Sequence, residues 1–248
     1  MTQNLSGFGR IPIFTDCTGS GEPVARTVAG PINFDGGFIL TGDGLAEADS
    51  GAVRQSALNG VVRLTTTDEA DHAVYLGTSV MYDVGRMGSI VAEARVSLPA
   101  LTARRFFFGF SDENADAETN ILTGSTATLT LTKSDLGGFF FDSGLTSKNW
   151  HTVYNGGTTA GVTNATQLDS DVAPVGGEFN VLRLVANKDG SLEYYIDGEH
   201  IATVAGALST TVNLAVVCGV AATTTTVATG DVDYVGINAG RVWDIDNA

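Results

Sequence analysis

Residues Glu178–Val204 read EFNVLRLVANKDGSLEYYIDGEHIATV, and this stretch decides the fold. Apolar and polar residues alternate over Phe179–Ala186, which is the pattern of a half-buried β-strand. A second strand, Leu192–Ile196, follows an Asp-Gly pair at 189–190, and Asp-Gly supplies the positive φ that a tight hairpin needs. Another Asp-Gly pair at 197–198 precedes a third strand. The stretch therefore predicts a β-meander.

The same strand pattern extends over most of the chain. In Ser89–Leu98 the apolar side chains fall on one face, whereas Glu93 and Arg95 fall on the other. The other predicted strands are Phe38–Thr41, Val61–Thr65, Ala73–Leu76, Arg105–Phe110, Ala127–Thr132, Gly138–Asp142, Trp150–Tyr154, His200–Val204, Val212–Val220, Val232–Ile237 and Arg241–Asp244. Many short strands with almost no helical periodicity predict an all-β, two-sheet antiparallel β-sandwich.

The composition excludes several classes of protein. Of the 248 residues, 43% are hydrophobic and only 17% are charged, which excludes a largely disordered chain. The net charge of −15 argues against a nucleic-acid partner, because phosphate contacts need a surplus of Lys and Arg. No apolar run reaches 18 residues and the start lacks a signal-peptide pattern, so we expect no membrane partner and two free thiols, at Cys17 and Cys218.

The first 35 residues differ from the rest. They contain three of the five prolines, many glycines and no convincing alternating run, which is typical of an extended segment. We therefore predict an N-terminal arm over residues 1–35 and a single β-sandwich domain over residues 36–248. Apolar side chains in the arm are costly to leave in water, so we expect the arm to dock on a surface. The arm residues expected to make this contact are Phe8, Ile11, Ile13 and Phe14.

Several segments carry motifs of a known fold family. They are Leu182–Val185 (LRLV), Tyr195–Gly198 (YIDG), Ile201–Val204 (IATV), Phe106–Asp112 (FFFGFSD), Asp231–Ile237 (DVDYVGI) and Arg241–Trp243 (RVW). Together they resemble the concanavalin A-like lectin/glucanase superfamily, particularly its laminin-G-like branch. The resemblance implies a concanavalin A-like jelly roll over about Phe38 to Trp243. The motifs place strands and turns and do not define a ligand site.

In overall style the chain resembles virion structural proteins of tailed bacteriophages. The features behind this resemblance are the unsignalled start, the Gly/Pro-rich arm and an acidic sandwich without a catalytic motif. It implies a non-enzymatic capsid decoration protein, assembled in the host cytoplasm, whose arm contacts capsid protein or copies of itself. The alternative is a lectin-like module that binds glycans in adhesion or capture.

The sequence gives no pattern for catalysis, and we expect no enzymatic activity. Glucanases of the superfamily carry a motif like E-x-D-x-x-E, which is absent here. Glu193 and Asp197 would share a strand face about 13 Å apart, and Asp231 and Asp233 about 7 Å apart without a third carboxylate. No zinc motif, serine elbow or phosphate-binding loop occurs.

One acidic loop, Ser111–Asn120, offers oxygen ligands at closely spaced positions. Calcium prefers such ligands, and lectins of this superfamily use calcium near their binding loops. The candidate calcium ligands are Asp112, Glu113, Asn114, Asp116 and Glu118. The loop lacks the EF-hand spacing, so a solvated acidic loop without any cofactor is the alternative.

Aromatic residues near one predicted strand offer a second candidate site. Trp150, His151 and Tyr154 could stack against a sugar, although aromatic side chains are equally normal in a sandwich core. The adjacent basic pair Arg104-Arg105 also has two readings. It either faces an acidic partner or begins a strand in solvent.

Overall fold

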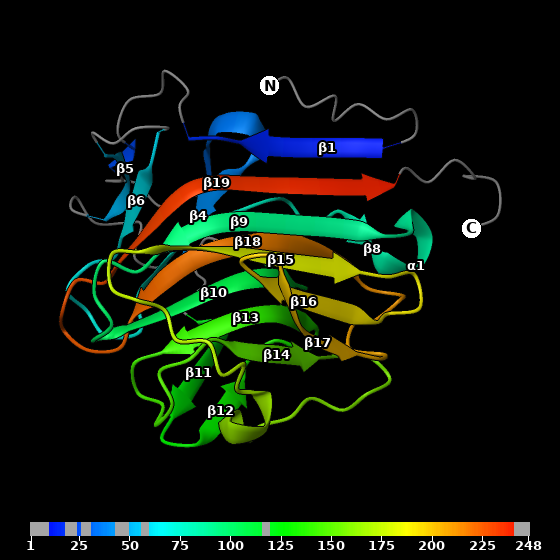
Figure 1. Cartoon of the computed structure of the whole chain (residues 1–248). Coiled ribbons are helices and arrows are strands. Elements are labelled where there is room, and N and C mark those ends of the chain that lie inside the picture. Colours follow the sequence, from blue (N-terminus) through cyan, green and yellow to red (C-terminus); the bar gives the residue numbers. More distant parts are fainter. Residues whose placement is uncertain are drawn as a thin grey trace.

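A computed structural model of the chain gives the fold. It describes residues 10–17, 24–25, 31–42, 50–55, 60–115 and 120–240. Nearly all regular structure in these ranges is β, and the named strands pair in an antiparallel manner within two large sheets (Figure 1). The helical pieces are short: η1 (Asp35–Gly37), α1 (Val84–Met87) and η3 (Ala165–Leu168). In the described residues, none of the helices has the length and apolar character needed to cross a membrane. The predicted two-sheet sandwich is confirmed.

The larger sheet is called the β19 sheet here. Its strands in the described residues are β1 (Arg10–Thr15), β2 (Val24–Ala25), β5 (Gly51–Arg54), β6 (Val62–Thr65), β9 (Ile90–Ser97), β15 (Phe179–Ala186), β16 (Leu192–Ile196), β17 (Glu199–Val204) and β19 (Thr229–Gly240). They lie in the order β17-β16-β15-β9-β19-β6-β5-β2, and β1 also pairs with β19. The first part of β19 pairs with β6 and the last part with β1, so β19 changes neighbours along its length.

The second sheet is called the β10 sheet here. Its described strands are β3 (Ile32–Asn33), β4 (Ile39–Thr41), β7 (Ala73–Gly77), β8 (Tyr82–Asp83), β10 (Arg104–Ser111), β13 (Leu136–Asp142), β14 (His151–Asn155) and β18 (Asn213–Ala222). They lie in the order β14-β13-β10-β18-β7-β4-β3, with β8 paired to β18. A separate hairpin, β11 (Leu122–Ser125) and β12 (Thr128–Leu131), lies near β13.

The core lies between the two sheets. Alternate residues of β9 are buried as the sequence predicts, with Glu93 and Arg95 on the opposite, half-buried face. Phe139 of β13 and Tyr194 of β16 meet edge-to-face with ring centroids 5.5 Å apart, and the Tyr194 hydroxyl donates to the Val153 carbonyl at 2.9 Å. Such aromatic pairs add about 1 kcal/mol beyond the area they bury. An edge-to-face aromatic pair and a hydrogen bond thus join one sheet to the other.

The meander at β15–β17 forms as predicted, and β15 and β16 have the predicted bounds. Gly190 has φ +80°, and Asp197 and Gly198 have φ +52° and +87°, so both Asp-Gly turns use the left-handed region. The Asp197 carboxylate also accepts from the Val181 backbone N–H at 2.7 Å. The predicted free thiols Cys17 and Cys218 are buried and unbridged.

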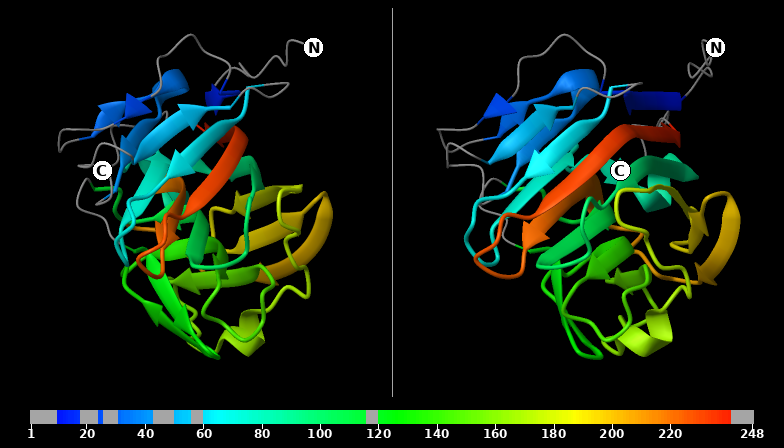
Figure 2. Two further views of the ribbon diagram at one scale, coloured as in Figure 1. Left: turned by 90° about the vertical axis from the view of Figure 1, so that its left-hand side faces the viewer. Right: turned by 60° about the vertical axis from the view of Figure 1, so that its left-hand side comes forward.

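The N-terminal segment differs from the predicted arm. Of its four expected contact residues, Phe8 lies outside the described residues, and the other three belong to β1. That strand pairs with β19 of the same chain from Arg10↔Gly240 to Thr15↔Val235 (Figure 2). Pro12 made the segment look unlike a strand, but an edge strand tolerates proline because one side of it needs no ladder hydrogen bond. Residues Arg10–Thr15 of the predicted arm therefore form a strand of the β19 sheet and do not extend away from the sandwich.

Candidate functional site

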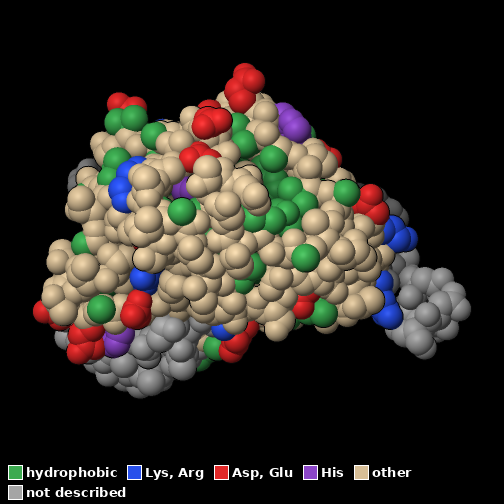
Figure 3. All heavy atoms as spheres, turned by 90° about the horizontal axis from the view of Figure 1, so that it is seen from below, with side chains coloured by type: hydrophobic (Ala, Val, Ile, Leu, Met, Phe, Trp, Pro, Cys, Tyr) green, Lys and Arg blue, Asp and Glu red, His purple; other side chains and the backbone are tan. Residues whose placement is uncertain are grey.

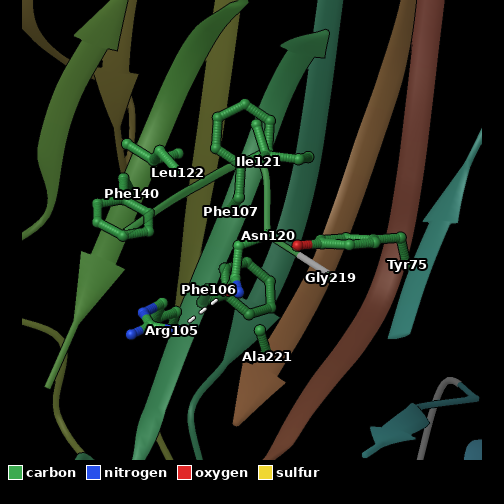
Figure 4. Close-up of a pocket in the computed structure, with 10 residues that line it drawn as sticks. All are labelled: Tyr75, Arg105, Phe106, Phe107, Asn120, Ile121, Leu122, Phe140, Gly219 and Ala221. Atoms are coloured by element: carbon green, nitrogen blue, oxygen red, sulfur yellow. Dashed lines mark hydrogen bonds between the residues drawn. The ribbon is translucent and has the colours of Figure 1, made fainter. Parts of the chain in front are cut away.

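The outer face of the β10 sheet is covered by loops, and polar side chains lie at the boundary between sheet and loops. On this face Arg105 and Phe107 of β10 stand opposite Asp142 and Phe140 of β13. Ile121 and Leu122 cover the aromatic rings (Figure 4). The free space left between these side chains is only about 10 Å³, at most the size of one water molecule. Its other lining residues are Tyr75, Phe106, Asn120, Gly219 and Ala221.

Arg105 is the centre of a fixed polar cluster. Its Nε donates to Asp142 Oδ2 at 2.9 Å, and its Nη1 donates to Asp71 Oδ1 at 2.6 Å. The Nη1 atom also donates to Asn120 Oδ1 at 3.1 Å, the bond drawn in Figure 4. The Asn120 Nδ2 group donates back to Asp71 Oδ1 at 3.3 Å. Hydrogen bonds between ionised partners are stronger and more directional than neutral ones, so they hold the plane of the guanidinium. The cluster is therefore prearranged.

Asp142 ties this cluster to the neighbouring loops. Its side chain is fully buried, and burying a carboxylate is costly unless it is paired and hydrogen-bonded. Besides Arg105, it accepts from the backbone N–H of Gly124 at 2.8 Å and of Gly144 at 2.6 Å. One carboxylate therefore fixes β10, β11 and the turn after β13 relative to one another.

From this cluster a groove of about 470 Å³ opens to solvent. Hydroxyl side chains and two cations line it, with small apolar side chains between them. The lining residues are Leu101, Thr102, Ala103, Arg105, Gly124, Asp142, Ser143, Gly144, Lys148, Thr223 and Thr224. The Lys148 ammonium donates to the backbone carbonyls of Ser143 and Leu145. A concave surface with a few fixed donors and acceptors is what a small polar ligand requires.

The predicted sugar-stacking residues lie elsewhere and are buried. Trp150 is 1% exposed, His151 0% and Tyr154 7%. Trp150 packs edge-to-face against Phe106 at 5.9 Å, and its Nε1 donates to Asn180 Oδ1 at 3.2 Å. The structure favours the alternative to sugar stacking, that these three residues belong to the core. Packing against the core and the covering loops leaves no ring face for a ligand.

His151 is an unusual part of this buried group. Both ring nitrogens are buried without a hydrogen-bond partner within the described residues. Burial lowers the pKa of His151, and the charge of Asp169 opposes that shift. Burial therefore favours the neutral form of the imidazole.

The acidic loop does not gather its side chains at one point. Glu113 pairs with Lys133 at 2.7 Å, and the Asn114 amide bonds to Thr41 and Thr78. Asp116 and Glu118 lie outside the described residues. No group of three His, Cys, Asp or Glu side chains in the described ranges is placed to hold a metal ion. The described part of the donor set does not fit a calcium site.

Asp112, the first acidic residue of that loop, forms a close pair with Asp135. The Asp135 backbone N–H donates to Asp112 Oδ2 at 3.2 Å, while the Oδ1 atoms of both residues are buried without a partner in the described residues. Burial raises the pKa of Asp135, and the charge of Asp112 raises it further. The Asp135 carboxyl group is therefore held toward its protonated form.

The other carboxylates considered for catalysis each have a partner. Asp231 pairs with Arg63 at 2.7 Å, and Asp233 with Arg95 at 2.6 Å. Glu193 accepts from the Tyr195 hydroxyl at 2.6 Å, which lies on its own strand. Each of these three carboxylates therefore makes a contact that supports the sheet.

Comparisons with known proteins agree at the level of the fold. No protein-family model matches the chain. No curated protein matches it either. Among solved structures, a peanut lectin with a nine-residue peptide aligns at a TM-score of 0.52 and 10% identity over 93% of this chain and 97% of its own. The chain therefore shares the two-sheet sandwich fold of that lectin.

Two further solved structures share this lectin fold. A mutant form of the Emp46p carbohydrate recognition domain aligns at a TM-score of 0.51 and 11% identity over 81% of this chain and 87% of its own. The conserved carbohydrate esterase vb_24B_21 from Shiga toxin-encoding bacteriophage phi24B aligns at 0.51 and 14% identity, over 83% and 91%. At such identities the similarity is one of fold alone.

Within the lectin fold, sequence reasoning missed most of the groove. Its lining comes from segments far apart in the chain, and short polar loops carry no motif. Arg105 was singled out, and its acidic partners prove to be Asp142 and Asp71 of the same chain. An arginine at the start of one strand and an aspartate at the end of another were the available signal. Antiparallel pairing of β10 with β13 would then have brought them together.

Proposed function

We propose that the protein is a non-enzymatic carbohydrate-binding module that holds glycans in the groove beside Arg105. The observation that carries the proposal is the hydrogen-bonded cluster of Arg105, Asp142, Asn120 and Asp71, of which Arg105 and Asp142 line a groove that also carries hydroxyl groups. A saccharide presents many hydroxyls in fixed directions, so it benefits from donors and acceptors that need no reordering on binding. The shared fold with lectins supports this choice.

The charge of the groove favours a neutral saccharide. Arg105 and Lys148 bring two positive charges to the lining and Asp142 one negative charge, and Asp71, which does not line the groove but pairs with Arg105, supplies the second negative charge. The groove therefore has no net charge to attract an anionic ligand. Between the polar groups, Leu101 and Ala103 offer apolar surface for the C–H face of a sugar ring.

The proposal is tested by blocking the mouth of the groove. Thr224 is exposed and lines it, so Thr224→Arg places a long side chain where the saccharide would lie. In a panel of neutral oligosaccharides, we expect binding measured by calorimetry to weaken at least about tenfold, or about 1.4 kcal/mol. Thr226→Arg is the matched control, because Thr226 is exposed in the same loop but does not line the groove. Equal binding by both variants, or no saccharide bound by the unchanged chain, would contradict the proposal.

A further inference from the structure

A row of side chains crosses the outer face of the β19 sheet, on the opposite side of the sandwich from the groove. Register places Phe14 opposite Gly236, Gly236 opposite Glu93, Glu93 opposite Arg183, and Arg183 opposite Tyr195. The five strands β1, β19, β9, β15 and β16 lie side by side (Figure 1). At about 4.8 Å between neighbours, the row is about 19 Å long.

Gly236 makes a notch in this row. It lacks a side chain, and the Phe14 ring lies beside it so closely that a Cβ at Gly236 would be 3.2 Å from Phe14 Cδ2. Phe14 is 43% exposed, and its ring centroid is 6.0 Å from that of Tyr234. A hollow of about 280 Å³ opens here, next to Val91. One aromatic face is thus presented to solvent at the edge of a hollow.

Polar groups of different kinds line the hollow. Glu93 Oε1 accepts from the Tyr234 hydroxyl at 2.8 Å, which orients the carboxylate. Arg183 is exposed and lies over the Tyr195 ring at 5.9 Å, and it makes no hydrogen bond or ion pair in the described part of the chain. Asn238 holds Arg10 through its side-chain and backbone oxygens. A carboxylate, a guanidinium and an amide therefore line one hollow with an aromatic ring.

We propose that this hollow is a second saccharide site, so that one chain binds carbohydrate on both outer faces of the sandwich. An exposed ring suits the C–H face of a sugar, and the planar polar groups of Glu93, Arg183 and Asn238 suit its hydroxyls. Adjacent opposite charges on Glu93 and Arg183 cancel, which disfavours a charged ligand. A single half-exposed ring among polar groups is too little apolar surface for a stable protein contact. The inference rests on the proposed carbohydrate binding and adds a second, oppositely directed site.

The test reads the two sites separately. Gly236 reports on the hollow and Gly144 on the groove, so we would follow their backbone amide signals by nuclear magnetic resonance in the nitrogen-labelled full chain. The probes are maltotetraose, cellotetraose, mannotetraose and chitotetraose. We expect a saturable shift at Gly236 that weakens about tenfold in Phe14→Ala and in Arg183→Gln, while the Gly144 signal responds as before. The exposed Arg183→Gln keeps the test valid if Phe14→Ala disturbs β1.

Matched controls are Met81→Ala and Arg86→Gln, which change an exposed apolar and an exposed basic residue that do not line the hollow. A response at Gly144 alone would overturn the second site and leave the proposed function standing. A response at Gly236 alone would support the second site and overturn the groove. No response at either would overturn both. A Gly236 shift that follows protein concentration without any saccharide would overturn the second site in favour of a second copy.

Discussion

At the scale of single residues, the carboxyl pair Asp112 and Asp135 predicts a measurable effect of pH on stability. Because the pKa of Asp135 is raised in the folded chain, the folded state holds a proton that the unfolded state releases. This contribution to stability is present at low pH and is lost as pH rises through the raised pKa.

The variant Asp135→Asn removes the ionisable group. At neutral pH we expect it to raise the free energy of unfolding by about 1 kcal/mol, because a buried charge without a full set of partners costs at least that much. The gain should disappear in acid. Urea unfolding at several pH values measures this, with Glu178→Gln as a control at a solvent-exposed carboxylate. A loss of stability at neutral pH would show that the charge of Asp135 is needed.

His151 predicts the opposite dependence on pH. Burial lowers the pKa of His151 below its usual value, so the unfolded state binds a proton more readily than the folded state. Stability should therefore fall as pH drops below about 6.5, the ordinary histidine pKa. We expect His151→Gln to flatten this decline in thermal unfolding between about pH 7 and 5. The exposed His200 provides a control, since His200→Gln should leave the decline in place.

At the scale of elements, hydrogen exchange in β1 can distinguish an edge strand of this sheet from an arm that binds neighbouring subunits. Its pairing with β19 predicts slow amide hydrogen exchange at alternate residues of Arg10–Thr15, even in dilute protein. The Ile13→Asp variant should abolish this protection, because Ile13 packs against the core. Exchange as fast as in an unfolded peptide in the unchanged protein would mean that the strand does not pair within the chain.

The elements also show what sequence patterns could and could not provide. Long alternating runs such as β9 and β15 were predicted, because burial on one face imposes period-two alternation. The missed strands β5, β8 and β11 are two to four residues long and contain glycines or no alternation. Such segments become strands because neighbouring strands offer them hydrogen bonds. Tertiary pairing of that kind leaves no local signal.

At the scale of the whole molecule, the two-sheet sandwich was predictable and the groove beside Arg105 was not. The motifs of the meander locate strands, whereas the groove beside Arg105 depends on four separate loops and strand ends meeting in space. The distribution of charge does not identify the groove either, because acidic groups are spread over the surface, as on the face in Figure 3. The net charge of −15 thus reflects a general surface property and marks no site.

The virion hypothesis belongs to this scale and stays a prediction. If the protein decorates a capsid, it should co-sediment with assembled particles. Monomeric behaviour and absence from purified particles would count against that role. The same preparation, probed with the Thr224→Arg variant, would separate capsid attachment from glycan capture through the groove.

The change of neighbours along β19 has a practical consequence for anyone who shortens this chain. Val235–Gly240 is an inner segment because β1 lies along it, flanked on the other side by β9. Starting the chain after Thr15 would bare a row of unpaired amides and carbonyls beside apolar Val235 and Ile237. Open edges of this kind recruit strands from other molecules and lead to aggregation. Tags are therefore better attached ahead of β1 than substituted for it.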